Sequence, residues 1–314
     1  MPHHLEIDST RGGLLAAGER FWDWEIPVYL FLGGLVAGLM LAACAVILAF
    51  GRERVTRAMR LGLAAAPVLL GLGMGALFLD LTLKTHVFRF YLTLRPSSPM
   101  SLGSWVLLLV FPAQALLALA LPFEGLAALL DRVPRIAPLR RFAEAQLPKL
   151  AWAGLILGVA LGVYTGVLLS ATVAHPLWSS GALGFLFLAS GTSTGVAALM
   201  LAERDHRAHG LLARADMALI ALELATLVLW LVGLSTQSEI YHRAAMLVLS
   251  GPYAPAFLGV VVFGGLLVPL VLEALALRGR AIASRAVPAL VIAGGLVLRF
   301  VVVFAGQELS FVTG

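Results

Sequence analysis

Residues 26–60 read IPVYLFLGGLVAGLMLAACAVILAFGRERVTRAMR, an uninterrupted apolar run followed by a short connection rich in arginine. Because about 20 apolar residues in a helix cross the hydrocarbon core of a bilayer, the run predicts a membrane-spanning helix. The same pattern recurs along the sequence and predicts an all-α integral membrane protein with eight transmembrane helices. The expected spans are Ile26 to Phe50, Leu61 to Leu81, Trp105 to Leu121, Leu150 to Ser170, Leu183 to Leu201, Met217 to Leu234, Ala256 to Leu277 and Val287 to Ala305.

Composition supports one membrane domain that covers residues 1–314. The protein is 61% hydrophobic and 12% charged, with a mean hydropathy of +0.97, as expected for a protein whose surroundings are lipid. Its net charge of +5 comes from arginines in short connections, where membrane topology and anionic lipid headgroups account for them. No nucleic-acid partner is therefore expected.

Lysine and arginine fall on alternate connections between the expected spans. The connections after the first, third, fifth and seventh spans hold 15 of the 22 Lys and Arg residues. Connections rich in these residues stay in the cytoplasm, so we expect both termini on the opposite side, the periplasm of a bacterium. The expected order is a periplasmic segment at residues 1–24, an eight-helix bundle at residues 25–305 and a periplasmic C-terminus at residues 306–314, in the cytoplasmic (inner) membrane.

Cysteine and histidine usage argues against a metal centre in this protein. Cys44 is the single cysteine, so no pair exists to bind zinc, an iron–sulfur cluster or a c-type haem. The seven histidines lie in termini or connections, so none is placed to ligate a b-type haem between two spans. His206 and His209 have the spacing of metal ligands on one helix face, but they lie in a basic connection, where solvation is the expected state. We expect no haem, no iron–sulfur cluster and no other metal.

Glycines at four-residue spacing predict close helix packing. Tyr164 lies on nearly the opposite side of the fourth span from that span's glycines, so it faces another helix, a ligand or lipid. The glycines are Gly154, Gly158, Gly162 and Gly166 in span four, with the pairs Gly34 and Gly38, Gly71 and Gly75, and Gly191 and Gly195 in spans one, two and five.

Polar side chains at membrane depth are costly and are functional candidates. Asp216, Glu223 and Thr226 share one face of span six, which predicts a polar route inward from the cytoplasmic end. Arg299 lies deep in span eight and Glu273 near the cytoplasmic end of span seven. The candidates to extend the route are Gln114, Ser190, Thr192, Ser193 and Thr194.

The alternative interpretation of these polar residues is structural. Glu223 and Arg299 would form an ion pair between helices, and the Ser and Thr hydroxyls would bond their own backbones. The sequence alone leaves the two interpretations equal.

The connection after span two begins at Asp80 and interleaves aromatic and basic residues up to Tyr91. These residues have the composition of an interfacial aromatic belt with anchoring charges. However, Asp80, His86 and Arg89 also bring proton-active and anion-pairing groups to the mouth of the bundle. They predict a site for a polar headgroup.

Four motifs in order along the sequence resemble the NrfD/PsrC family, the membrane subunits of polysulfide reductase and of related molybdenum-enzyme or cytochrome complexes. Together they extend over essentially the whole sequence, and their order on eight helices makes the resemblance specific. The motifs are FLGGLVAG at residues 31–38, the aspartate-initiated connection ending in SPMS at residues 98–101, GVYTG at residues 162–166 and LRFVVVFAGQ at residues 298–307.

The resemblance implies two four-helix bundles without haem and a site for menaquinone or ubiquinone near the periplasmic face. A periplasmic ferredoxin-like iron–sulfur subunit would exchange electrons with that site. The catalytic subunit would be a molybdopterin enzyme or a multihaem cytochrome, so no catalytic residue for its substrate is expected in this protein. By the family pattern, Tyr164 contacts the quinone.

The sequence departs from the polysulfide-reductase pattern near span one. Where that type has Asn and His, this sequence has Trp22, Asp23, Trp24 and Glu25, so His86, Asp80 or Glu25 becomes the candidate second headgroup partner. The connection also reads DLTLK from Asp80, where many members have Asp-Leu-Gly-Arg-Pro, which favours a branch with a different catalytic partner.

The function expected is that of a quinone-reactive membrane anchor of a respiratory oxidoreductase, with proton movement as a hypothesis raised by the buried polar face. Two alternatives remain at this stage. One is a secondary transporter with a site at the membrane midplane, and the other is an inert membrane anchor. Transporters favour inverted repeats with helices broken in corresponding halves, and no matching pair of breaks is evident here.

Overall fold

The computed structural model describes residues 22–80, 99–172, 174–278 and 285–311. Eight helices within these ranges are long and apolar enough to cross a membrane, which confirms the all-α fold of eight spans. They are α1 (Glu25–Phe50), α2 (Arg57–Asp80), α4 (Pro99–Ala120), α7 (Leu147–Ser170), α8 (Ala182–Ala202), α9 (His206–Ser235), η4 (Pro255–Leu267) continued by α11 (Val268–Leu277), and α12 (Ala286–Gln307).

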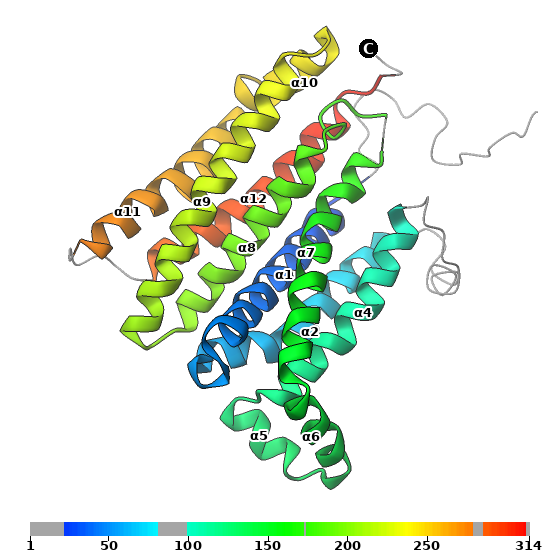
Figure 1. Ribbon diagram of the computed structural model, residues 1–314. Coiled ribbons are helices and arrows are strands. Elements are labelled where there is room, and N and C mark those ends of the chain that lie inside the picture. Colours follow the sequence, from blue (N-terminus) through cyan, green and yellow to red (C-terminus); the bar gives the residue numbers. More distant parts are fainter. Residues whose placement is uncertain (1–21, 81–98, 173, 279–284, 312–314) are drawn as a thin grey trace, which may run out of the picture.

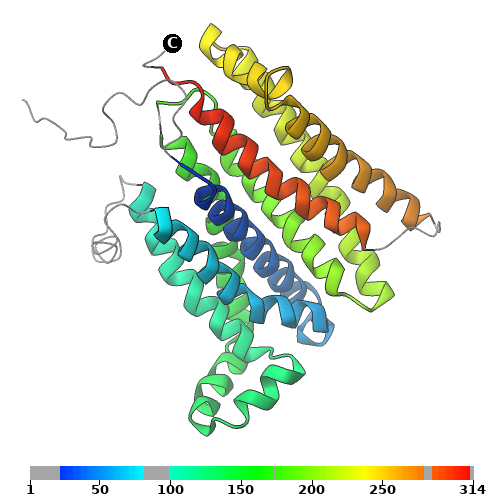
Figure 2. The same cartoon turned by 180° about the vertical axis from the view of Figure 1, so that it is seen from behind.

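The spans form two groups (Figure 1). Helices α1, α2, α4 and α7 pack together as the first bundle, and α8, α9, η4 with α11, and α12 form the second. The bundles meet where α1 and α7 pack on α8, with α12 also touching α1, and the view from behind shows the same arrangement (Figure 2).

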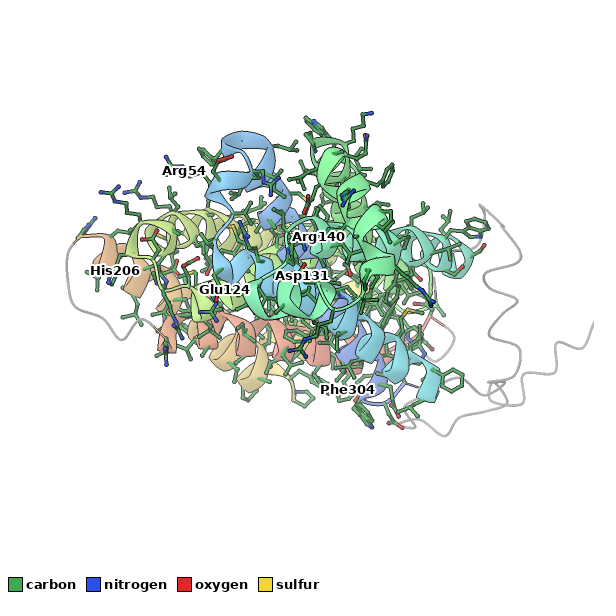
Figure 3. All side chains as sticks on the ribbon, turned by 90° about the horizontal axis from the view of Figure 1, so that it is seen from below. Arg54, Glu124, Asp131, Arg140, His206 and Phe304 are labelled. Carbon is green, nitrogen blue, oxygen red and sulfur yellow. The ribbon has the colours of Figure 1, made fainter. Side chains whose placement is uncertain are left out.

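The two ends of the molecule differ in charge. At the basic end, short connections carry η1 (Arg52–Arg54), η3 (Pro134–Ile136) and the helices α5 (Glu124–Leu130) and α6 (Ala137–Ala145). Figure 3 looks onto this end, where the labelled residues include Arg54, Arg140 and His206. The opposite end, here called the terminal end, holds the start of α1, the end of α12 and α10 (Glu239–Leu249).

Hydrogen bonds hold the two described ends of the protein together at the terminal end. The Trp22 backbone N–H donates to Gln307 Oε1 at 2.9 Å, and Gln307 Nε2 donates to the Trp22 carbonyl oxygen at 3.1 Å. An even number of spans requires both ends on one side. The pairing therefore supports an even number of spans independently of hydropathy.

Glycines set the junction between the bundles, as the sequence predicted for spans one, four and five. A Cβ on Gly38 would collide with the backbone of Gly191, and one on Gly195 would collide with the backbone of Gly38. Gly166 lies equally close to the backbone of residues 183–184. Such approach is possible only without side chains.

The prediction was wrong for Gly71 and Gly75 in span two, where no atom of a described residue lies within 4 Å of an added Cβ. Gly73 faces inward there instead, against Leu32 at 3.2 Å. Spacing identifies a face of a helix, but it does not say whether another helix covers that face.

Three features of the helices were not predicted. Helix α9 begins at His206, so His206 and His209 lie in its first turn and not in a connecting loop. The start of α9 is stabilised by Asp205, whose carboxylate accepts from the Ala208 N–H at 3.0 Å.

Short amphipathic helices occupy the third and sixth connections, where hydropathy finds no span. In the seventh span, η4 is a π-helix, which apolar composition does not distinguish from an α-helix.

Candidate quinone site and buried polar line

Tyr164 lies on α7 within two turns of its terminal end, and its phenol rests directly on α4. A Cβ at Gly103 would occupy the position of the Tyr164 ring carbon and hydroxyl oxygen. Gly103 is one turn into α4, at the same end of the bundle. The absence of a side chain at this position is therefore what lets the phenol lie between the two helices.

Two of the other predicted headgroup residues lie at the same end of the first bundle. Glu25 begins α1, and its Oε2 atom is buried with no hydrogen-bond partner among the described residues. Asp80 is the last residue of α2 and is half-buried. His86 and Arg89 lie outside the described residues. The start of α1, the end of α2, the start of α4 and the end of α7 thus lie at one end of the first bundle (Figure 1).

Sequence reasoning missed two residues of this region. Gly103 carried no signal, because only the contact with Tyr164 shows what its missing side chain does. The Trp105 indole Nε1 is buried without an acceptor in the part of the protein that the structure describes. Burying an indole N–H without an acceptor is costly, and that cost is the only signal in the sequence that could have pointed to Trp105.

A separate series of buried charged side chains extends from the basic end of the second bundle to about the middle of its spans. Ser193 Oγ donates to Asp216 Oδ1 at 2.6 Å, and the Glu273 carboxyl lies beside Asp216. Both acids are buried, at 0% and 3% exposure. No donor from a described residue reaches Asp216 Oδ2 or either oxygen of Glu273. Two buried carboxylates in contact repel each other, and a shared proton removes that repulsion.

Glu223 lies two turns along α9 from Asp216, with Ser190 of α8 beside its carboxyl. The same hydroxyl accepts a hydrogen bond from Arg299 Nη1. The structural alternative expected a direct Glu223–Arg299 ion pair, and none forms within 4.0 Å among the described residues. Ser190 instead lies between the two charged groups, where it accepts from Arg299 and lies beside the Glu223 carboxyl.

Backbone carbonyl groups and an aromatic ring also contact the Arg299 guanidinium. Nη1 donates to the Gly295 carbonyl at 3.0 Å and Nη2 to the Phe187 carbonyl at 3.2 Å, with the Phe187 ring 4.8 Å from Cζ. Nε has no acceptor among the described residues. The arginine is fully buried, so these contacts replace the water it lost.

Not every predicted member belongs to this line. Thr226 donates to the Leu222 carbonyl at 2.8 Å, and Thr194 to the Ser190 carbonyl at 2.6 Å, as the structural interpretation expected. Gln114 is buried in α4, which packs in the first bundle. Its side-chain amide finds no partner among the described residues, and it does not extend the line.

Comparison with known proteins identifies the family. A family model described as polysulphide reductase, NrfD matches residues 16–310. The protein belongs to the NrfD family.

The C subunit of polysulfide reductase from Wolinella succinogenes is 32% identical over 305 residues, which cover 91% of the present sequence and 94% of that subunit. Protein NrfD of Escherichia coli is 32% identical over 311 residues, covering 91% and 95% respectively. The NrfD homolog of Haemophilus influenzae is 28% identical over 310 residues, covering 91% and 94%.

The resemblance inferred from four motifs is thereby confirmed, and NrfD-family proteins are membrane subunits of respiratory oxidoreductases. Three of the NrfD motifs meet in this structure around α1. A Cβ at Gly33 would lie 3.2 Å from Thr165 Cγ2, and a Cβ at Gly34 would lie 3.1 Å from Arg299 Nη2. Consecutive glycines of α1 therefore face the neighbour of Tyr164 and the buried guanidinium.

Proposed function

We propose that this protein is the quinone-reactive membrane subunit of a respiratory oxidoreductase. Its quinone site would lie at the terminal end of the first bundle, with Tyr164, Glu25 and Asp80 around the headgroup. The Tyr164 phenol seated on Gly103 carries this proposal, because it places a hydrogen-bonding group between two helices at that end.

The residues at this end suit a quinone headgroup, whose two carbonyl oxygens need hydrogen-bond donors. A phenol donates one hydrogen bond, an indole N–H donates another, and a protonated carboxyl can donate a third. Tyr164, Trp105 and Glu25 supply these groups, and the last two have polar atoms without partners among the described residues. His86 and Arg89 remain candidates from the sequence.

A bound quinone would supply two-electron, two-proton redox chemistry. In this arrangement Tyr164 holds and orients a carbonyl oxygen, while Glu25 or Asp80 accepts or gives a proton at the terminal end. The substrate of the complex is handled outside this protein, by a catalytic subunit that a ferredoxin-like iron–sulfur subunit connects to the quinone.

We further propose that the terminal end is periplasmic and that the membrane is the bacterial inner membrane. The alternation of Lys and Arg supports this orientation. A reporter fused after Gly314 should then behave as periplasmic, and one inserted near Ala137 should behave as cytoplasmic. The reverse labelling would place the quinone site on the cytoplasmic side.

Replacing Tyr164 with Phe in the assembled complex tests the site. Quinol turnover should fall about three- to tenfold, because one hydrogen bond is lost while the shape is kept. Activity of the complex with a soluble electron acceptor should not change. Tyr253→Phe is the matched control, since its phenol donates to Glu308 elsewhere at the terminal end. Equal loss of both activities in Tyr164→Phe would instead indicate structural damage.

The same preparation separates the two alternative functions. A complex that retains quinone after purification, and loses turnover in Tyr164→Phe, is neither an inert anchor nor a transporter. Unchanged quinol turnover in a stable Tyr164→Phe complex would favour the inert anchor. Membership of the NrfD family already weighs against a secondary transporter.

A further inference from the structure

The basic end contains a pocket that the proposed quinone chemistry does not use. Its volume is about 410 Å³, and it lies between η1, the start of α2 and the short helices α5 and α6. Four arginine side chains line it: Arg52, Arg57, Arg60 and Arg140. A cleft lined by an excess of arginines attracts anions.

The four arginines of the pocket outnumber the two carboxylates that also line it, Glu124 and Glu144. Arg140 is paired with Glu144 at 3.0 Å and with Asp131 at 3.1 Å. No carboxylate of a described residue lies within 4.0 Å of Arg52, Arg57 or Arg60. The first turn of α2, which contains two of these arginines, holds no acidic residue to offset them.

A second pocket of about 250 Å³ adjoins the first, and Arg57 lines both. Arg204 and Arg285 also line this second pocket. Glu203 is there too, but its carboxylate accepts from the backbone N–H groups of Arg204 and Asp205, at 2.9 and 3.0 Å. The positive surface therefore continues across Arg57 toward the second bundle.

Apolar surface borders the same site. Phe123, Pro122 and Ala127 form part of the wall of the larger pocket. On the adjoining helices α5 and α6, Leu129 and Phe142 are 57% and 55% exposed. Helix α6 also carries Arg140 and Arg141. A short helix that is apolar on one side and basic on the other lies at the level of lipid headgroups, with the apolar side toward the acyl chains.

From this combination we propose that the basic end holds an anionic phospholipid, with its phosphate on Arg52, Arg57 and Arg60 and its acyl chains along α5 and α6. A free phosphate ion would satisfy the arginines equally, but it would gain nothing from the apolar wall. Lipid bound here would fix η1 and the α5–α6 pair against the ends of the spans.

The test compares lipids retained by the purified full-length protein. The protein is reconstituted in phosphatidylcholine alone, or in an equimolar mixture with phosphatidylglycerol, extracted in mild detergent and analysed by native mass spectrometry. Wild-type protein should retain phosphatidylglycerol in preference to phosphatidylcholine. The triple variant Arg52→Gln, Arg57→Gln, Arg60→Gln should bind it at least about tenfold more weakly, since each basic group near a membrane surface contributes to anionic lipid binding.

The matched control removes three arginines from the same end that do not line either pocket. Arg132→Gln, Arg135→Gln, Arg141→Gln loses the same charge, so general attraction and topology change equally, and it should retain the lipid. Equal loss in both triple variants, or no preference in the wild type, would overturn the proposal. If an equal concentration of inorganic phosphate displaces phosphatidylglycerol, the pocket binds a soluble anion and the proposal of a lipid site is wrong. If the triple variant does not assemble, Arg57→Gln alone should show partial loss, and undiminished retention would contradict the site.

Discussion

The two four-helix bundles differ in whether charged side chains are buried between their helices. Among the described residues, the buried charged side chains Asp216, Glu223, Glu273 and Arg299 all belong to the second bundle. In the first bundle the candidate headgroup residues, Tyr164 among them, lie near one end, and the deeply buried Gln114 of α4 is uncharged. Charge at membrane depth costs roughly 2.5–3.5 kcal/mol per group on insertion scales, so the second bundle maintains an expensive feature that the first avoids. From this difference we propose a division of roles, with quinone chemistry at one end of the first bundle and proton movement in the second.

Arg299→Met would break the second bundle most severely. The change leaves Ser190 and two backbone carbonyls without their donor and removes the positive charge nearest to Glu223. We expect a loss of about 3–5 kcal/mol in the free energy of unfolding, measured by denaturant unfolding in detergent. Arg285→Met, an exposed position at the start of the same helix, should change it by less than about 0.5 kcal/mol. A similar small effect at Arg299 would show that the buried contacts contribute little.

Gly103→Ala would disturb the first bundle with a different signature. The new Cβ takes the place of the Tyr164 hydroxyl, and the ring can swing away, so we expect a small change in stability. Quinol turnover should fall tenfold or more, because a displacement of about 1 Å at a reacting group is costly. Gly75→Ala, where no atom from the described part of the protein lies within 4 Å of the added Cβ, is the control.

Combining Gly103→Ala with the loss of the Tyr164 phenol shows whether Gly103 acts through that phenol. In a Tyr164→Ala complex, the clash with Gly103→Ala no longer exists, so the second change should have no further effect on turnover. An undiminished effect there would mean that Gly103 acts through the quinone or the helix itself and not through Tyr164.

The smallest expected effect concerns pH at the terminal end, outside both bundles. Burial lowers the pKa of His175, and its ring Nδ1 lies 3.0 Å from the Leu309 carbonyl oxygen. A lowered pKa means that protonation favours the unfolded state, so the contribution of His175 is present above its ordinary pKa and is lost as the pH falls below it. Between pH 7.5 and 5, wild-type protein should lose about 1–2 °C more in apparent melting temperature than His175→Gln. An equal loss in both proteins would exclude His175 as the cause.

The fold could be predicted almost completely from the sequence, because hydropathy and arginine placement depend on the bilayer and not on particular contacts. The buried acids were also found in advance, since Asp216 and Glu223 stand out in apolar helices. Their partners were not. Whether Arg299 meets Glu223 directly or through Ser190 depends on how α8 and α12 are rotated, which no single-sequence pattern specifies.

The candidate quinone site was predicted by residue type but not by contact. Tyr164 came from a motif, whereas Gly103 and Trp105 required the packing of α4 on α7. The role of Gly71 and Gly75 was predicted wrongly for the same reason, because spacing marks a face without naming what covers it.

The proposed division of roles between the two bundles is tested most directly by the number of protons moved per electron. This ratio is measured in liposomes that contain the assembled complex. Tyr164→Phe should slow quinone turnover and leave the ratio unchanged. Glu223→Gln removes the titrating group but keeps its size, so turnover should persist while proton uptake from the basic side falls. Asp216→Asn should act in the same direction. A stable Glu223→Gln complex with an unchanged ratio would contradict the account, and Glu223 would then serve only to hold the second bundle together.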